Sequence, residues 1–329
     1  MRTHPKTLAA LVAATACALC GGPAAAADEG AAGWPRDTVR LIVPYPPGGS
    51  VDSAARVLAN ALSAKAGRPV VVENKAGADG VIGMTAVGRA PPDGHTLAVS
   101  LKGAMVVAPA TSKLPFNPLT DFKALGGLAQ TAEIYATHPG TGLRTLRDLP
   151  QALRQNGNKL SIGYVGALPR MLSELLVQEM RVDLLRVPYK GLPAALQDLI
   201  GGQTDMLVGD AIGVLGEQVK AGKIVPLAVT SPERWPALPQ VPTTHELGLP
   251  ALAGNQWYAL YGPRDLPPAL VSRIHAVVDE VMKQPAVLNQ LASFGLQPYP
   301  SSPAELAATM REETRFWKDV AAKAKIVPE

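Results

Sequence analysis

Apolar strands alternate with amphipathic helices along most of this chain, and this alternation constrains the fold more than any other feature. Residues 39–44 form an apolar, β-branched run that ends at a loop rich in proline and glycine, as expected for a buried strand. From Ser50 to Lys65 the apolar residues recur at helical spacing. A strand, a helix and a second strand are expected at 69–73, 81–89 and 96–101. This order predicts an α/β fold with mostly parallel sheets flanked by helices.

The alternation starts again in the middle of the chain, which indicates a second α/β unit. Strands are expected at 134–137, 160–164, 184–187, 205–208 and 225–229, and helices near 146–154, 170–180, 193–200 and 212–220. With 329 residues, 47% of them hydrophobic, the chain is long enough to bury two cores.

The last third of the chain begins with a stretch rich in proline and polar residues at 231–249, which is expected to cross the surface with one short helix around 244–246. A strand and two helices are then expected at 256–261, 268–283 and 286–294. Ser302 and Glu305 have the spacing of a capping box, and Pro303 lies between them, so a final helix should begin there.

Residues 1–27 have the pattern of a cleavable signal peptide. Arg2 and Lys6 give it a charged start, residues 8–19 are apolar, and the alanines at 25–27 are suitable for cleavage. The apolar part is shorter than the roughly 20 residues that cross a bilayer. We therefore expect export to the periplasm as a soluble protein.

Both cysteines, Cys17 and Cys20, lie inside this leader, so the mature chain is expected to have no disulfide, thiolate metal site or cysteine nucleophile. Lipid attachment at either cysteine is the alternative, and the bulky Leu19 and the small Ala14 disfavour it. Cleavage would reduce the formal net charge from +4 to about +2. Because the basic residues are dispersed, nucleic acid is not expected as a partner.

The loop from Pro44 to Asp52 is the clearest candidate for a binding site. It contains Gly48 and Gly49 and leads from a buried strand into a helix. The glycines allow close approach of a ligand to the backbone, and the first amides of a helix have free donors that suit an anion. The alternative is a tight turn in which Ser50 caps the helix.

Signatures of common enzymes are absent from the sequence. The loop lacks the G-x-G-x-x-G spacing of dinucleotide sites and the Gly-Lys-Ser/Thr of a P-loop, and Ser50 lacks the second glycine of a hydrolase elbow. The histidines are too widely separated for a helical metal motif. We therefore predict no catalytic residue, no cofactor and no metal site.

Loops at 164–170, 187–191 and 208–210 each follow an expected strand of the second unit and precede an expected helix. In open parallel sheets ligands bind beyond the carboxyl ends of the strands, so these loops and the first loop could share one pocket. Each loop could also be a simple connection between elements.

Blocks of sequence along essentially the whole mature chain resemble one family, the extracytoplasmic receptors of the tripartite tricarboxylate transporter system, or Bug (TctC-like) family. The blocks are RLIVPYPPGGSVDSAAR, PVVVENKAGADGVIG, APPDGHTLAVS, VPYKG, AGKIVPLAVTS and PALPQVPTTHELGLP. The resemblance implies a type II-like, two-lobed periplasmic binding protein, with residues 28–130 plus 255–329 in lobe 1 and 131–254 in lobe 2.

The resemblance also implies a function. Such a solute-binding protein captures a small organic anion with a carboxylate group for membrane permease subunits of a tripartite tricarboxylate transporter, and it is expected to be a monomer. The alternatives are an orphan ligand sensor for a signalling system and, less favoured, an enzyme on the same α/β scaffold.

Carried over residue by residue, the resemblance implies a set of ligand-binding positions. The first loop contributes Tyr45, Pro47, Gly48, Gly49, Ser50 and Asp52, and the second lobe contributes Asp210. Tyr189, in the loop at 187–191, is also a predicted contact.

Two loops depart from the family pattern, which has more hydroxyl groups there. One provides Tyr164, Gly166, Ala167, Leu168 and Arg170, and the other provides Lys102. We hypothesise a less hydroxylated ligand whose second anionic group pairs with Arg170 or Lys102, because a guanidinium can bind a carboxylate through two hydrogen bonds. The alternative is that both cations point to solvent.

Overall fold

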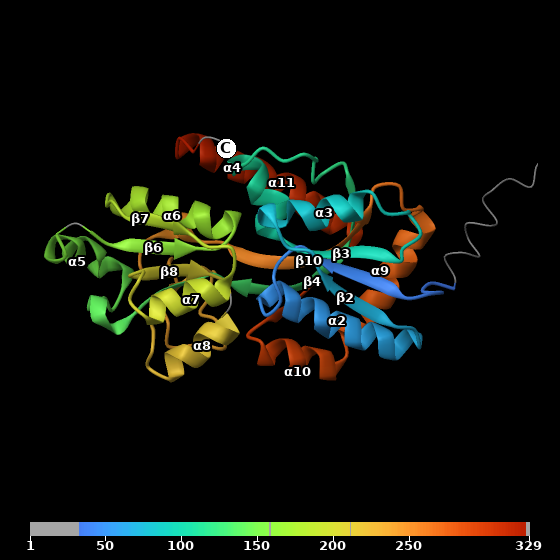
Figure 1. Ribbon diagram of the computed structural model, residues 1–329, viewed down its shortest axis with the longest axis horizontal. Coiled ribbons are helices and arrows are strands. Elements are labelled where there is room, and N and C mark those ends of the chain that lie inside the picture. The colour runs from blue at the N-terminus through green and yellow to red at the C-terminus, as the bar shows by residue number, and fades with distance from the viewer. Residues whose placement is uncertain (1–32, 158, 211, 327–329) are drawn as a thin grey trace, which may run out of the picture.

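The computed structural model describes residues 33–326 except 158 and 211, and it contains two β-sheets, each flanked by helices (Figure 1). The α/β class expected from the sequence is thus confirmed. The signal-peptide pattern at 1–27 lies outside the described residues, as do Cys17 and Cys20. We call the six-stranded sheet with its helices the first unit, and the five-stranded sheet with its helices the second unit.

Strands from both ends of the described chain build the sheet of the first unit, in the order β11-β4-β10-β3-β1-β2. They are β1 (Val39–Val43), β2 (Val70–Asn74), β3 (Thr96–Leu101), β4 (Phe122–Ala132), β10 (Asn255–Pro263) and β11 (Gln297–Ser301). The helices of this unit are α2 (Ser50–Ala66), α3 (Val81–Gly88), α4 (Ala108–Thr111), α9 (Pro268–Met282), α10 (Pro285–Ser293) and α11 (Pro303–Lys323). A short 3-10 turn (Ala78–Gly80) and a π-helical turn (Gly103–Val107) also belong to it.

The middle of the chain builds the second unit, whose strand order is β7-β6-β8-β5-β9. Its strands are β5 (Ile134–Thr137), β6 (Ser161–Tyr164), β7 (Leu185–Pro188), β8 (Met206–Gly209) and β9 (Val225–Val229). Its helices are α5 (Leu149–Gln155), α6 (Ala167–Met180), α7 (Leu192–Ile200) and α8 (Ile212–Lys220), with 3-10 turns at Pro139–Thr141, Leu146–Asp148 and Pro250–Leu252.

The two sheets share one strand order. In each, three parallel strands are followed by a strand that arrives from the other unit and runs antiparallel, which is β10 in the first unit and β5 in the second. Most strands of each sheet thus run in one direction, as the sequence predicts, and β10, β11 and β5 are the exceptions. A strand that comes from the other unit enters at the carboxyl edge of the sheet, so it must run opposite to the strands that end there.

Two segments connect the units, one at Glu133 and one at Gly254, and Thr230 forms hydrogen bonds with both. Its hydroxyl accepts a hydrogen bond from the Glu133 backbone N–H (2.9 Å) and donates one to the Gly254 carbonyl (2.8 Å). The Thr230 N–H donates to the Glu133 carbonyl at 3.0 Å. Glu133 separates β4 from β5, whereas Thr230 and Gly254 lie between β9 and β10. All chain crossings between the sheets within the described residues thus meet at one place.

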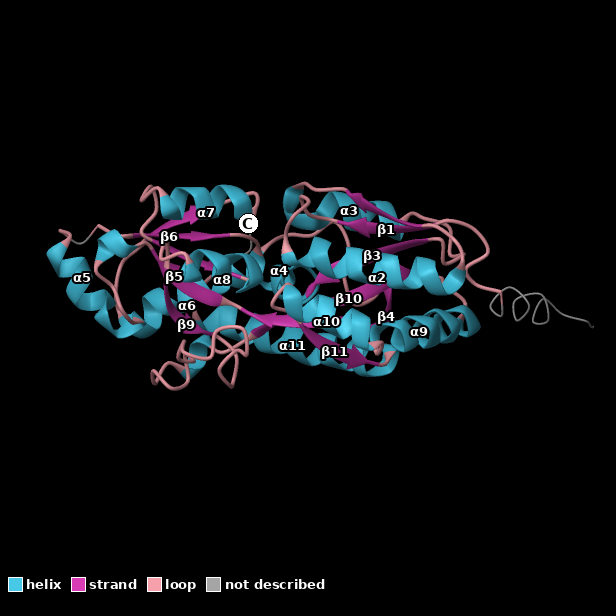
Figure 2. Cartoon of the chain, turned by 90° about the horizontal axis from the view of Figure 1, so that it is seen from below, coloured by secondary structure: helices cyan, strands magenta, loops and turns pink. Residues whose placement is uncertain are grey.

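Helix α11 begins at the predicted capping box. The Ser302 hydroxyl accepts from the Glu305 N–H (3.2 Å), and the Glu305 carboxylate accepts from the Ser302 N–H (2.8 Å). The helix packs against β4 and β11 of the first unit (Figure 2). Just beyond its end, the Ala324 carbonyl accepts a hydrogen bond from Gln178 of α6, so this segment also contacts the second unit.

The short helix expected around 244–246 is instead an isolated turn. Thr243 and Glu246 form reciprocal hydrogen bonds, in which the Glu246 N–H donates to the Thr243 hydroxyl (3.0 Å) and the Thr243 N–H donates to the Glu246 carboxylate (2.8 Å). Gly248, with a φ of +70°, then takes the backbone out of helical geometry. The hydrogen bonds of a helix N-terminus are thus present, but no helical turns follow them.

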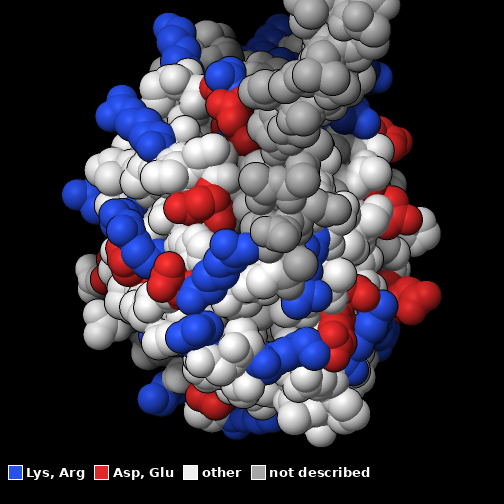
Figure 3. Space-filling model, turned by 90° about the vertical axis from the view of Figure 1, so that its right-hand side faces the viewer, with Lys and Arg blue, Asp and Glu red and all other residues white. Residues whose placement is uncertain are grey.

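The surface carries charges of both signs. On the face in Figure 3, which is the right-hand end of the view in Figure 1, lysine and arginine side chains are interspersed with aspartate and glutamate. Among the described residues, no helix has the length and apolar character that crossing a membrane requires.

Candidate functional site

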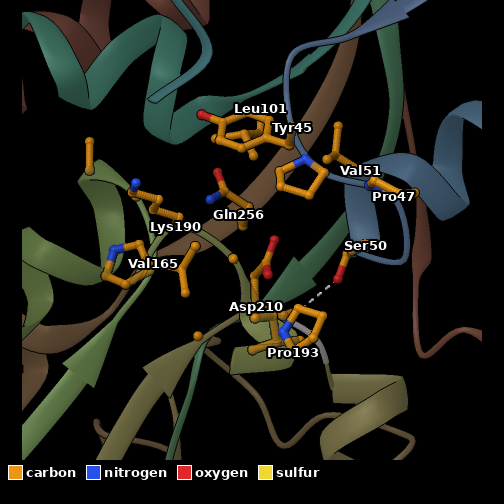
Figure 4. A pocket seen from close by; sticks show the side chains of 18 residues that line it. Tyr45, Pro47, Ser50, Val51, Leu101, Val165, Lys190, Pro193, Asp210 and Gln256 are labelled. Carbon is orange, nitrogen blue, oxygen red and sulfur yellow. Dashed lines mark hydrogen bonds between the residues drawn. The ribbon is translucent and has the colours of Figure 1, made fainter. Parts of the chain in front are cut away.

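A pocket lies where the loops of the two units face each other, at the carboxyl ends of β1, β3, β6, β7 and β8 (Figure 4). It encloses about 640 Å³, including the part that is open to solvent. The first loop and all three loops predicted in the second unit contribute residues to it. The sequence therefore predicted correctly which loops meet, since the carboxyl ends of parallel strands point to the same edge of a sheet.

The first loop supplies one wall of the pocket through Tyr45, Pro47, Gly49 and Ser50. Gly49 is the N-cap residue of α2, and no side chain caps this end of the helix. The first N–H groups of an α-helix have no acceptor within the helix, and the positive end of the helix dipole lies behind them. The wall therefore combines free donors with a favourable potential for an anion.

Asp52 lies behind this wall and is not part of the lining. Its carboxylate accepts hydrogen bonds from the Gly48 N–H (3.1 Å), Arg56 (2.9 Å) and Asn74 (2.9 Å). Burial acts to raise the pKa of Asp52, but these hydrogen bonds outweigh it and the pKa is lowered. Asp52 thus fixes the conformation of the loop. Gly48, at a φ of +89°, is likewise part of the loop but outside the lining.

The second unit supplies the opposite wall with Gly166, Ala167 and Asp210 among the predicted residues. The Ser50 hydroxyl donates a hydrogen bond to the Asp210 carbonyl at 3.3 Å, so the two walls are in direct contact (Figure 4). Other lining residues were not predicted individually, and they are Pro46, Val51, Leu101, Val165, Pro169, Lys190, Gly191, Leu192, Pro193, Gly209 and Gln256.

Two carboxyl groups lie at or beneath the pocket floor. The Tyr258 hydroxyl donates to the Asp210 carboxylate at 2.7 Å, and burial raises the pKa of Asp210. Glu133 is 0% exposed, and burial together with the negative charge of Asp210 raises the pKa of Glu133 well above its ordinary value. The positive charge of Lys102 acts in the opposite direction on Glu133.

Gln256 links the pocket floor to Glu133, which lies in one of the segments that connect the units. Its side-chain oxygen accepts from the Gly103 N–H (3.0 Å), which leaves its amide nitrogen to donate toward the Glu133 carboxyl (3.4 Å). Gln256 therefore has a fixed orientation at the pocket wall. Little in the sequence indicates this role, because the residue is only a polar position at the start of an apolar strand.

Lys102 does not reach the pocket. Its ammonium group pairs with Glu313 of α11 at 3.2 Å and lies 5.6 Å from the centre of the Trp317 ring. The residue is only 5% exposed, and burial lowers its pKa. The burial of Lys102 contradicts the solvent-exposed interpretation, and the long side chain extends toward α11 of the first unit instead of the pocket lining.

Arg170 lies outside the lining, on the first turn of α6, and its charge acts on Asp79 of the first unit. Burial raises the pKa of Asp79, while the Tyr45 hydroxyl and the positive charge of Arg170 act to lower it. A Cβ atom at Gly166 would lie 3.5 Å from the Asp79 carboxylate, so Asp79 reaches the second unit. The positive charge of Arg170 thus acts on an acidic residue of the other unit.

The remaining predicted residues also lie outside the lining. Leu168 is fully buried in the core. The Tyr189 hydroxyl donates to the Asp198 carboxylate at 2.7 Å, and Tyr164 packs against the core at the end of β6. Within the described part of the chain, no group of three or more histidine, cysteine or acidic side chains is placed to hold a metal ion.

Comparison with known proteins gives consistent matches over most of the chain. Residues 54–326 match a family described as "Tripartite tricarboxylate transporter family receptor". The protein BugT of Bordetella pertussis is 30% identical over 90% of this chain and 91% of its own length.

Two solved structures from Rhodopseudomonas palustris are similar throughout. MatC with bound malate is 31% identical, with a TM-score of 0.81, and the match covers 88% of this chain and 100% of MatC. Rpa4515 with adipate is 28% identical, with a TM-score of 0.83, and the match covers 90% of this chain and 100% of Rpa4515.

Proposed function

This chain belongs to the tripartite tricarboxylate transporter receptor family, and we propose that it captures a small carboxylate-bearing molecule in the periplasm, between two lobes that close around it. Export by the pattern at 1–27 is part of this proposal. The proposed function is binding without chemical turnover, followed by delivery to membrane permease subunits.

One observation carries the proposal. The uncapped N-terminus of α2 opens into a pocket between two units, where Gly49, Ser50 and Val51 line the wall. A carboxylate placed there would accept hydrogen bonds from backbone N–H groups and benefit from the helix dipole. The structures of the relatives MatC and Rpa4515 contain malate and adipate, which are both carboxylates, and this supports the same class of ligand here.

The proposed lobes follow the two sheets. Lobe 1 comprises 28–130 and 255–329, and lobe 2 comprises 131–254, so the boundaries lie near the end of β4 and at the start of β10. Because the connecting segments meet at Thr230, rotation of one lobe about this place would open the pocket without disturbing either sheet. Binding would then favour the closed arrangement.

The test is a thermal-shift screen of carboxylates followed by titration calorimetry of each ligand that stabilises the protein. A ligand at 100 times its dissociation constant should stabilise the folded state by about 2.7 kcal/mol. We expect one molecule bound per chain and no product. Turnover of the ligand would instead favour the enzyme alternative.

Gly49→Phe is the matched variant for this test. A Cβ atom at Gly49 meets nothing within 4 Å, and its φ of −85° suits any residue, so the variant should fold normally. The aromatic ring should nevertheless occupy the space in front of the first N–H groups of α2, where the carboxylate is proposed to bind. We expect the ligand-induced shift to disappear while the melting temperature without ligand changes little. Unaltered binding would argue against this wall as the carboxylate site.

A further inference from the structure

The two walls of the pocket differ in their supply of hydrogen-bond donors. Helices α6 and α7 begin at the pocket, but Pro169 lies in the first turn of α6 and Pro193 in the first turn of α7, and both prolines line the pocket. Proline has no N–H group. Helix α2, on the opposite wall, starts with Ser50, Val51 and Asp52 and keeps all its first amides.

Side chains add to this asymmetry. The segments 165–169 and 191–193 have the sequences VGALP and GLP, which contain no polar side chain. Val165, Ala167 and Leu192 line the pocket, and Leu101 adds a further apolar surface from β3. The wall of the second unit is therefore suited to an apolar group, whose removal from water favours binding.

Few cationic groups in or near the pocket are placed to pair with a second anionic group. Asp210 lines the floor, and its carboxyl accepts a hydrogen bond from the Tyr258 hydroxyl at 2.7 Å, so it offers a second carboxylate no donor (Figure 4). Among the described lining residues the one cationic side chain is Lys190, which is exposed. The charge of Arg170 acts on Asp79, and that of Lys102 is paired with Glu313.

Resting on the proposed function, we infer that the ligand is a monocarboxylate with an uncharged, apolar body. Its carboxylate lies at the N-terminus of α2, and its body lies against the segments 165–169 and 191–193. This replaces our sequence-based hypothesis of a second anionic group that pairs with Arg170 or Lys102.

Matched pairs of acids test the inference. Each pair differs by one carboxylate, for example hexanoate against adipate and benzoate against terephthalate, and the panel extends from four to eight carbons. In the pair that binds best, calorimetry should give a dissociation constant at least tenfold lower for the monocarboxylate than for the dicarboxylate. Equal or tighter binding of the dicarboxylate overturns the inference but leaves the proposed function standing. If no acid of either kind binds, both fail.

Two variants should reduce the preference for the monocarboxylate. Asp210→Asn gives the floor a side chain that can donate a hydrogen bond, and Val165→Thr adds a hydroxyl group without a large change of shape. We expect each to lower the ratio of the two dissociation constants at least threefold. The control is Asp183→Asn, because the Asp183 side chain is 96% exposed and lies outside the pocket. An unchanged ratio in both pocket variants would contradict the assignment of the apolar wall.

Discussion

Glu133 is the residue whose ionisation should couple most strongly to folding. Its carboxyl is fully buried, one of its oxygens has no hydrogen-bond partner, and Asp210, Lys102 and the Gln256 amide are the groups that act on it. Its pKa is raised above the ordinary value of 4.5. The folded state therefore keeps this proton at pH values where the unfolded chain has lost it.

The sign of the pH effect follows from that difference in protonation. Between pH 4.5 and the raised pKa of Glu133, the folded state binds more protons than the unfolded state, so stability falls as the pH rises. Glu133→Gln should flatten this dependence, because the amide cannot ionise and can still accept from Gln256. Urea unfolding of the wild type and the variant at pH 5, 6.5 and 8 measures this pH dependence of stability. An unchanged slope in the variant would show that Glu133 does not titrate in this range.

The sequence located backbone positions better than the ends of long side chains. Gly49 and Ser50 were predictable because a loop between a strand and a helix fixes where the backbone goes. Lys102 was not, since its flexible side chain pairs with Glu313, which is far away in the sequence. Gln256 was also missed, because its partners Gly103 and Glu133 are likewise far away in the sequence.

At the element scale, β4 and β11 show why some strands were not predicted. β4 contains Gly126 and Gly127, which lower its strand signal, and β11 contains Pro298 and Pro300. Proline is tolerated in β11 because this strand is at the edge of the sheet. The glycines of β4 have a packing role that becomes visible only once β11 is in place.

Gly127 allows β11 to approach β4 closely. A Cβ atom at this position would lie 2.3 Å from the Tyr299 carbonyl oxygen, so the backbone of β11 would have to move. We expect Gly127→Ala to destabilise the protein by about 2–3 kcal/mol through overpacking. Denaturant unfolding measures this effect.

Gly216→Ala is the matched control for this glycine substitution. A Cβ atom there meets only the Leu238 side chain, at 3.8 Å, and the residue lies inside α8. Alanine should stabilise the helix by up to about 1 kcal/mol because glycine is a poor helix former. A similar loss of stability in both variants would mean that the contact with Tyr299 is not the cause.

At the scale of the whole molecule, Asp79 should favour the closed arrangement. It belongs to the first unit, lies close to Gly166, and is under the influence of the positive charge of Arg170 on the second unit. Asp79→Asn should shift the population toward open forms and raise the dissociation constant for the ligand severalfold. Small-angle scattering, with and without ligand, should give a larger radius of gyration for the ligand-free variant than for the ligand-free wild type.

Salt provides the control for this electrostatic effect. Ionic screening should bring wild type and variant closer together at high ionic strength, since the Debye length falls to about 3 Å at 1 M salt. A difference that persists unchanged at 1 M salt would point to a local structural cause instead.

The shared strand order of the two sheets has a consequence for folding as the chain leaves a ribosome or a translocation channel. In the first unit, β10 lies between β3 and β4 and pairs with both. β1 to β3 therefore emerge early, but they cannot be joined to β4 until the residues from 255 onward have appeared. The second unit needs only residues up to β9 for its own sheet. We expect the first unit, whose strands β1 to β3 are made first, to finish folding last. A chaperone would therefore act on the unpaired edge of β3.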